Sequence, residues 1–248
     1  MVRSLAALQR PRSLPEINAS RDIKMSDVPL SRHLLGAGLT VEAINDVASW
    51  KRRTYAQGIP FRLTSAQPRV LERGWVFAGM TLPSGRRQEV HLFLPGDFID
   101  LSDSMSKTFD LNPASSAIVA DVPENASGRP EFQAFTAQGR VTKDALMFAH
   151  ALRLGGFDAI GRIAHFLLET ECRLRASASE HSPVLGWPLR QTHIADYLSL
   201  GSVHVCRTLL KLKSAGLADV SRGLRIYDRK GLADIFSATR REALATAS

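Results

Sequence analysis

The sequence contains little cysteine, no long apolar run and fewer acidic than basic residues. Its two cysteines, Cys172 and Cys206, are too few for a disulfide framework in a chain of 248 residues. No apolar stretch approaches the roughly 20 residues that a membrane-spanning helix needs. The apolar part of residues 1–15 is too short and too often interrupted for a signal peptide. Together these features predict a cytoplasmic protein that does not span a membrane.

Motifs that carry enzyme chemistry are also missing. The sequence contains no Gly-x-Ser-x-Gly nucleophile elbow, no phosphate-cradling loop and no cluster of metal ligands. Asp97 and Asp100 lie close together, but the turn expected at Pro95 and Gly96 explains both. We therefore expect neither an enzyme nor a metal site.

The composition favours a polyanionic partner. Lys and Arg number 32 and Asp and Glu number 24, which gives a net charge of +8. Hydrophobic residues make up 44% of the chain, enough for two domains with sizeable cores. Changes in hydrophobic period divide the chain into four parts: a flexible basic arm over 1–30, an antiparallel β-roll over 31–138, a connecting helix and hinge over 139–156, and a helical unit over 157–248.

The period also predicts the elements of the first half, and the fold class is α+β. Residues 31–50 are expected to be helical, with Thr40 as an N-cap. Short strands follow as far as residue 135, with turns near Gly85 and Gly96. A helix then runs over 142–154 and is apolar on more than one face, so it needs a second surface to cover it, either the roll or the same helix of a second copy.

The stretch from Gln191 to Lys213 predicts two short amphipathic helices joined by a tight turn. Apolar residues form one stripe across both helices, namely Ile194, Ala195, Leu198, Val205, Leu209 and Leu212. Arg207 and Lys211 are left on the outer side of the second helix. A helix with one buried side and a cationic outer side is suited to the major groove of DNA.

The residues after this pair predict a β-hairpin, which would form the wing of a winged helix. Apolar and polar residues alternate over 217–228 on both sides of Arg222 and Gly223. From Pro188 to Gly231 there are 8 Lys and Arg and 3 Asp and Glu, a net charge of +5. Two helices, wing and charge together favour DNA over an ordinary solvated surface.

Three segments resemble the bacterial CRP/FNR superfamily of homodimeric transcription regulators. Gly85-Arg-Arg-Gln with Phe93-Leu-Pro-Gly-Asp-Phe is similar to the central hairpin and following loop of that family. Gly161-Arg-Ile-Ala-His-Phe-Leu-Leu-Glu-Thr is similar to the helix after its hinge, and Gln191 to Leu212 with the wing is similar to its DNA-binding unit. The resemblance covers roughly residues 35–232. It implies a cyclic-nucleotide-binding-like roll, a dimerisation helix, and double-stranded DNA, a second copy and RNA polymerase as partners.

Departures from the family pattern argue against its known cofactors. Leu101 stands where cyclic-nucleotide members have a ribose-binding Glu, and residues 109–117 lack the arginine that binds the cyclic phosphate, so we expect no cyclic-AMP binding. No cysteine precedes Cys172, which excludes the N-terminal cysteine set of a [4Fe–4S] cluster. His33, His91 and His150 are haem candidates by position only. We predict no cofactor.

The resemblance and the helix pattern assign roles to individual residues. We predict that base edges are read at the start of the second helix, by Ser202, Val203, His204 and Arg207. The predicted phosphate contacts are Arg190, Gln191, Thr192, Lys211 and Arg222. The predicted dimerisation residues are Leu146, Ala149 and Leu152.

Two copies would then read an inverted repeat as a homodimer. The alternative is a ligand-binding regulatory protein whose winged helix contacts another protein. The net charge of +5 and the outward position of Arg207 favour DNA.

Overall fold

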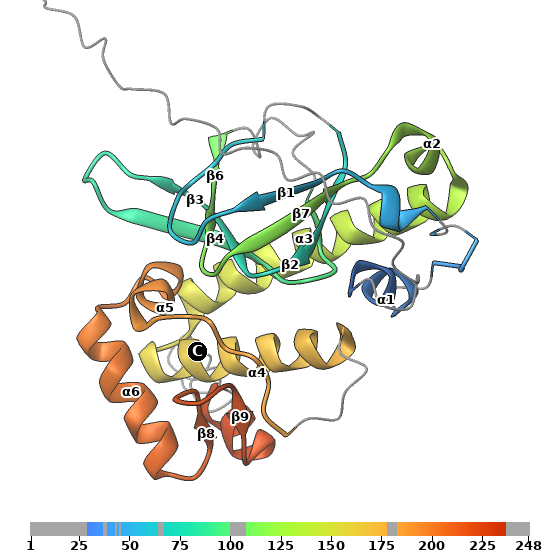
Figure 1. Ribbon diagram of the computed structural model, residues 1–248. Helices are drawn as coiled ribbons and strands as arrows, with labels where there is room; N and C mark the ends of the chain where they lie inside the picture. Colours follow the sequence, from blue (N-terminus) through green and yellow to red (C-terminus); the bar gives the residue numbers. More distant parts are fainter. Residues whose placement is uncertain are drawn as a thin grey trace, which may run out of the picture.

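The computed structural model describes residues 29–36, 39–42, 44, 46–63, 67–99, 108–177 and 183–236. A β-roll and a winged-helix unit lie on opposite sides of a long helix (Figure 1). Within the described residues, no helix is both long and apolar enough to span a bilayer. The basic arm predicted over 1–30 falls almost wholly outside this part of the chain.

Two antiparallel sheets form the roll, as the period-two pattern predicts. One has the order β1-β7-β2-β5 and consists of Arg52–Tyr55, Ala117–Asp121, Arg69–Arg73 and Phe98–Ile99. The other has the order β4-β3-β6 and consists of Arg87–Phe93, Val76–Thr81 and Asp110–Pro113. Their inward side chains form one apolar cluster, which includes Leu71, Phe93 and Val119. The stretch 70–82 is thus a pair of strands, β2 and β3, that belong to different sheets.

The helix expected over 31–50 was wrong as a single element. The structure has α1 over Pro29–Gly36 and a 3-10 turn, η2, over Val47–Ser49. Thr40 lies between them and caps no helix. Leu34 and Ile44 are both fully buried in one cluster with Trp50, so the chain folds back on itself to bury apolar residues from both segments. A continuous helix would place part of this apolar set in solvent.

The connecting helix starts earlier than its predicted beginning at 139–142. Helix α3 spans Pro130–Gly156, with proline at a position whose missing N–H costs no intrahelical hydrogen bond, and Thr142 lies in its interior. Helix α2, Glu124–Ser127, immediately precedes it. Gly139 does not break α3, because it lets the helix approach the side chain of Phe98: a Cβ there would lie 3.1 Å from the Phe98 Cβ.

The second half has the predicted order of elements. Helix α4 spans Ala159–Ser177, and Asp158 caps it by accepting a hydrogen bond from the Gly161 N–H at 2.8 Å. Helices α5 and α6 follow over Gln191–Leu198 and Ser202–Ser214. Strands β8, Ala218–Asp219, and β9, Arg225–Ile226, pair as the hairpin, and residues 229–236 are helical.

The roll and the winged-helix unit share one hydrophobic cluster. Phe77 and Leu92 of the roll are buried in the same cluster as Phe166 of α4 and Tyr197 of α5. The Phe77 and Tyr197 ring centroids lie 5.4 Å apart. The winged-helix unit therefore packs directly on the roll of its own chain, and α5 is packed against both the roll and α4.

Candidate nucleic-acid interface

Helix α5 begins with an exposed cationic end. Arg190 has an extended backbone, and its N–H donates to Nδ1 of His193 at 3.2 Å. Burial lowers the pKa of His193 and Arg190 lowers it further, which favours the neutral ring that accepts this bond. Arg190, Gln191 and Thr192 are all exposed beside the positive end of the helix dipole. Three predicted phosphate contacts thus share one helix end that favours an anion.

The turn between α5 and α6 is centred on a serine. Ser199 has a left-handed backbone, with φ 53° and ψ 47°, whereas Gly201 is extended. The left-handed residue of this turn is therefore the serine and not the nearby glycine. This conformation costs a non-glycine residue about 1–2 kcal/mol. The Ser199 hydroxyl donates to Oε1 of Gln88 in β4 at 2.7 Å, which offsets part of that cost.

Helix α6 buries one side and exposes the other. Val205, Thr208 and Leu212 are buried, while Leu209 is only half-buried. All four predicted base-reading residues are exposed, and they occupy the first two turns of the helix: Ser202, Val203, His204 and Arg207. The sequence pattern did not single out Leu210, which is 60% exposed and lies seven residues, or about two turns, after Val203. Its place on the same face could have been read from the spacing of seven residues.

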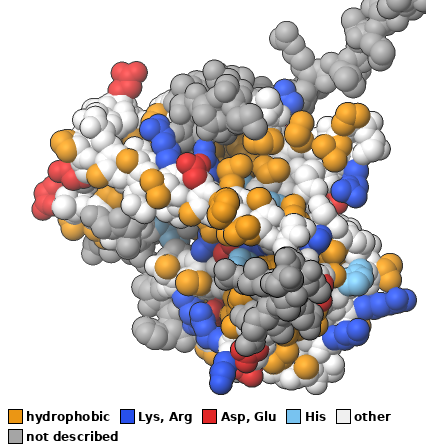
Figure 2. All heavy atoms as spheres, turned by 180° about the vertical axis from the view of Figure 1, so that it is seen from behind, with side chains coloured by type: hydrophobic (Ala, Val, Ile, Leu, Met, Phe, Trp, Pro, Cys, Tyr) orange, Lys and Arg blue, Asp and Glu red, His pale blue; other side chains and the backbone are white. Residues whose placement is uncertain are grey.

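The cations of α6 divide into two kinds. Arg207 and Lys211 are exposed and have no carboxylate partner among the described residues. Lys213 instead binds Asp219 of β8 at 2.9 Å and donates to the Ser221 hydroxyl. Burial alone would raise the pKa of Asp219, but hydrogen bonds from Lys213 and Ser221 hold it at about 2. Lys213 therefore joins α6 to the wing, which leaves Arg207 and Lys211 available to a ligand. Figure 2 shows Lys and Arg side chains projecting from the edge of the molecule where α6 lies.

The wing is held by a third segment that the sequence pattern did not reveal. The backbone of Leu185 exchanges two hydrogen bonds with Leu224, at 2.8 and 2.9 Å. Gly223 has a φ of 114°, and a Cβ there would lie 2.6 Å from Val184 Cγ1. Arg222 is exposed at the tip, as expected of a phosphate contact. The tip is therefore fixed against residues 184–185 rather than free in solvent.

A cavity of about 290 Å³ lies among the elements of the winged-helix unit. It is lined by the start of α5, by α6 and by the wing, and includes Arg190, Leu210 and Ser221. Cys206 lines it and is half-buried. Of the predicted DNA contacts, Arg190 and Gln191 line this cavity, whereas those of α6 and the wing tip do not.

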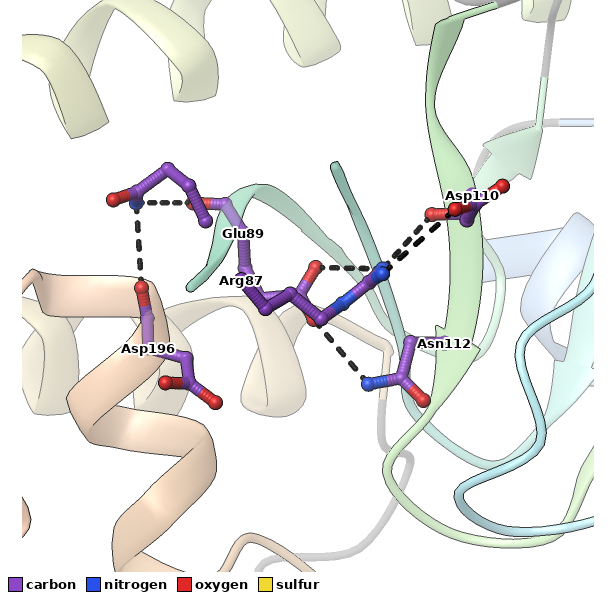
Figure 3. A network of polar contacts seen from close by, with 6 residues as sticks. Arg87, Glu89, Asp110, Asn112 and Asp196 are labelled. Carbon is purple, nitrogen blue, oxygen red and sulfur yellow. Dashed lines mark hydrogen bonds and ion pairs between the residues drawn. The ribbon is translucent and has the colours of Figure 1, made fainter. Parts of the chain in front are cut away.

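A polar network connects the roll to α5 (Figure 3). Arg87 donates to Oε1 of the buried Glu89 at 2.6 Å, and Asn112 donates to the same oxygen at 3.3 Å. Burial raises the pKa of Glu89 above its usual value, and the hydrogen bonds from Arg87 and Asn112 offset only part of that rise. Gln88, which lies between Arg87 and Glu89 in β4, donates to the backbone carbonyl of Asp196 at 3.3 Å. Strand β4 thereby holds the C-terminal half of α5.

A buried arginine connects α3, α4 and α5. Arg153 is fully buried, donates to Nδ1 of His165 at 3.1 Å and pairs with Glu169. Its guanidinium lies 5.8 Å from the ring centroid of Tyr197, on which His150 stacks at 4.1 Å. We call these five residues the Arg153 cluster. Burial lowers the pKa of His150 and of His165 to about 4, and Arg153 contributes to both shifts, so both rings are neutral near pH 7.

The predicted dimerisation residues do not share one environment. Leu146 and Ala149 are half-buried, whereas Leu152 is 54% exposed. Val141 and Phe148 are exposed to 62% and 67% on α3. With Leu152, these residues follow positions i, i+7 and i+11, which places them on one helix face. The structure therefore adds Val141 and Phe148 to the exposed apolar set.

The haem candidates and the nucleotide positions fall in different places. His91 is buried in β4, His150 belongs to the Arg153 cluster, and His33 is half-buried in α1. Asp100 and Leu101 lie outside the described residues. Within the described part of the chain, no three His, Cys, Asp or Glu residues are grouped so as to hold a metal ion.

This arrangement defines a class of protein: a winged helix-turn-helix unit mounted on a β-roll. Residues 161–235 match the model of the Crp-like helix-turn-helix domain. The nitrogen fixation regulation protein FixK of Bradyrhizobium diazoefficiens is 31% identical over 155 residues. That match covers 59% of this chain and 64% of FixK.

Solved structures share the fold as well. FixK2 from Bradyrhizobium japonicum superposes with a TM-score of 0.65 at 24% identity, over 75% of this chain and 96% of that one. A CRP-family transcriptional regulator of Thermus thermophilus gives a TM-score of 0.55 at 20% identity, also over 75% and 96%. The chain thus has a Crp-like helix-turn-helix domain within the CRP/FNR fold, which confirms the resemblance and the α+β fold class predicted from the sequence.

Proposed function

We propose that this protein is a transcription regulator that binds double-stranded DNA through α6. The observation that carries the proposal is the outer face of α6, where, among the described residues, Arg207 and Lys211 are exposed without carboxylate partners while Lys213 is occupied by Asp219. An unpaired guanidinium on a helix of this shape can donate two hydrogen bonds to guanine O6 and N7. Ser202, Val203 and His204 precede it on the end that enters the groove.

The flanking cations support a phosphate-binding role on both sides of α6. Arg190, Gln191 and Thr192 stand at the start of α5, and Arg222 stands at the wing tip. Such contacts orient a protein on the duplex without selecting a sequence. Because Arg190 at the start of α5 and Ser221 of the wing line the same cavity, one DNA backbone can contact α5 and the wing in a single pose.

We further propose that the protein acts as a homodimer. Val141, Phe148 and Leu152 expose more than half of their surface on one face of α3. Apolar side chains at this spacing are typical of a helix that pairs with a second copy. A twofold pair of α6 helices would then read an inverted repeat with half-sites about 34–36 Å apart. The sequence-based set shares Leu152 with this face.

The proposed regulator acts on transcription with RNA polymerase as its partner, and its roll does not bind cyclic AMP. The second part rests on the lack of arginine over 109–117, which would leave the cyclic phosphate without a cationic partner. Addition of cyclic AMP should therefore leave the DNA affinity unchanged.

Selection of bound genomic fragments with the full-length chain, followed by sequencing, tests the proposal. The expected result is enrichment of an inverted repeat whose affinity, measured by fluorescence anisotropy, falls steeply as salt rises. An Arg62→Ala variant serves as the control, because Arg62 is an exposed arginine of the roll outside the proposed interface. Failure to enrich any sequence, or an affinity independent of salt, would overturn the proposal.

A further inference from the structure

A second cavity lies at the end of the roll where η2 and α2 meet β1 and β7. Its volume is about 330 Å³, and polar side chains form most of its lining. Small-molecule sites have volumes of about 300–1,000 Å³, so this space can hold a small ligand. Figure 1 shows α2 and the helix pair α5–α6 at opposite ends of the molecule, which separates this cavity from the DNA-binding surface.

Three buried polar atoms at this cavity have no hydrogen-bond partner among the described residues. They are Trp50 Nε1, Arg53 Nε and Asp46 Oδ1, and each belongs to a residue that lines the cavity. Trp50 is only 4% exposed. Buried polar atoms are nearly always paired, because an unpaired one costs about 1–3 kcal/mol. Three at one cavity therefore point to a ligand that supplies the partners.

The rest of each side chain is fixed by neighbours. Arg53 pairs with Asp121 at 3.3 Å, and Asn125 donates to the second carboxylate oxygen of Asp46 at 3.4 Å. The turn that carries Trp50 is held by Arg52, which donates to the carbonyls of Trp50 and Val47 at 2.8 and 3.0 Å. The three unpaired atoms are therefore held in place before a ligand arrives, which lowers the entropy cost of binding.

The chemistry of these atoms defines the ligand. Trp50 Nε1 and Arg53 Nε are donors, and the second belongs to a cation, so both suit a carboxylate. Asp46 Oδ1 is an anionic acceptor and suits an ammonium group. We propose that this cavity binds a small zwitterion of the amino-acid class, with its carboxylate toward Trp50 and Arg53 and its ammonium toward Asp46.

Occupancy of the cavity has a direct route to the long helix. The Trp50 ring packs against Phe132 of α3, with centroids 5.4 Å apart. The same indole thus contacts the ligand through its nitrogen and α3 through its ring. Binding at this cavity does not depend on whether α6 binds DNA, so the two proposals fail separately.

Calorimetric titration and thermal unfolding of the full-length chain with each of the twenty L-amino acids test the proposal. We expect at least one to bind at one site per chain and to raise the melting temperature. Its amide and its N-acetyl derivative should each bind at least about tenfold more weakly, since each loses one charged hydrogen bond. Absence of binding by all twenty would overturn the proposal, as would equal binding of the N-acetyl derivative.

Two variants assign the binding to this cavity. Trp50→Phe removes the Nε1 donor and keeps the ring on Phe132, and Asp46→Asn removes the charge of the acceptor. Each should weaken binding at least about tenfold while the melting temperature of the ligand-free protein changes little, because each removes or neutralises an unpaired buried group. Trp75→Phe is the matched control and should bind as the wild type does, because Trp75 lies in the hydrophobic cluster that the roll shares with the winged-helix unit and not in that of Trp50. Unchanged binding in Trp50→Phe and Asp46→Asn would contradict the assignment.

Discussion

The outer face of α6 and the Arg153 cluster use the same kind of side chain in opposite ways. Arg207 on α6 is exposed and has no carboxylate partner within the described residues. Arg153 is fully buried and is bonded to Glu169 and His165. A solvated arginine keeps its hydrogen-bonding capacity for a partner that arrives later, whereas a buried one has committed it to the fold.

Exposed and buried cations therefore have different roles in this protein: exposed cations bind a partner, and buried cations hold helices in place. Removal of an exposed cation changes what the protein binds and leaves its stability almost unaltered. Removal of a buried one leaves its carboxylate partner unpaired, so stability changes first. Four experiments test this distinction, and the one with the greatest expected change comes first.

Substitution of Arg153 should have the largest effect. Arg153→Met leaves Glu169, which is 12% exposed, without its partner, and we expect the free energy of unfolding to fall by about 3–5 kcal/mol. Urea denaturation measures this change. The double variant Arg153→Met with Glu169→Gln removes the stranded charge and should recover part of the loss. A single variant as stable as the wild type would show that the buried pair does not hold the three helices together.

Substitution of Arg207 should change binding rather than stability. Arg207→Ala should cost about 1–3 kcal/mol of binding free energy on the selected DNA site and much less on a random duplex. Lys211→Ala is the matched comparison and should weaken binding to both duplexes alike, with a salt slope lower by about 1. Fluorescence anisotropy gives both numbers. An equal loss on the two duplexes for Arg207→Ala would make it a phosphate contact instead.

Acid should act on the Arg153 cluster. His150 and His165 have folded-state pKa values of about 4, below the 6.5 of an unperturbed histidine. Between these values the unfolded chain binds protons that the folded chain does not, so stability is full above pH 6.5 and falls as the pH drops toward 4. With screening taken into account, the loss is about 1–3 kcal/mol for the pair. The His150→Gln variant should show a shallower fall in urea titrations at about pH 7, 5.5 and 4.5, which span this window.

The smallest effect is expected at the turn between the two helices. Ser199→Ala keeps the left-handed backbone and loses the hydrogen bond to Gln88, which should cost about 0.5–1.5 kcal/mol. Once Gln88 is replaced by alanine, the serine substitution should cost less, because its partner is already gone. Strictly additive losses in this double-mutant cycle would show that the roll does not stabilise the turn.

Sequence could predict those parts of the molecule that depend on local spacing. The α5–α6 pair, the wing and the exposed positions of Ser202 and Arg207 follow from which residues share a helix face. The roll follows from alternation between turns. Asp158 as the cap of α4 follows from its place before the first turn.

The remaining parts depend on contacts between residues far apart in the chain. Arg153 lies in a helix like any surface arginine, and nothing in its neighbours shows that His165 and Glu169 will surround it. The start of α3 at Pro130 was missed because strands were expected as far as residue 135. The contact of Gly139 with Phe98, which packs this part of the helix on the roll, joins residues far apart in the chain. The hydrogen bond between Gln88 and Ser199 spans 111 residues, and no local pattern predicts it.

The uninterrupted course of α3 has a mechanical consequence. At 1.5 Å per residue, its 27 residues extend for about 40 Å. Phe132 near its first turn is set in the core beside Trp50, and Arg153 near its last turn is set in the core beside Tyr197. A tilt imposed at one end must be felt at the other, because a stiff helix anchored at both ends transmits displacement without intermediate parts.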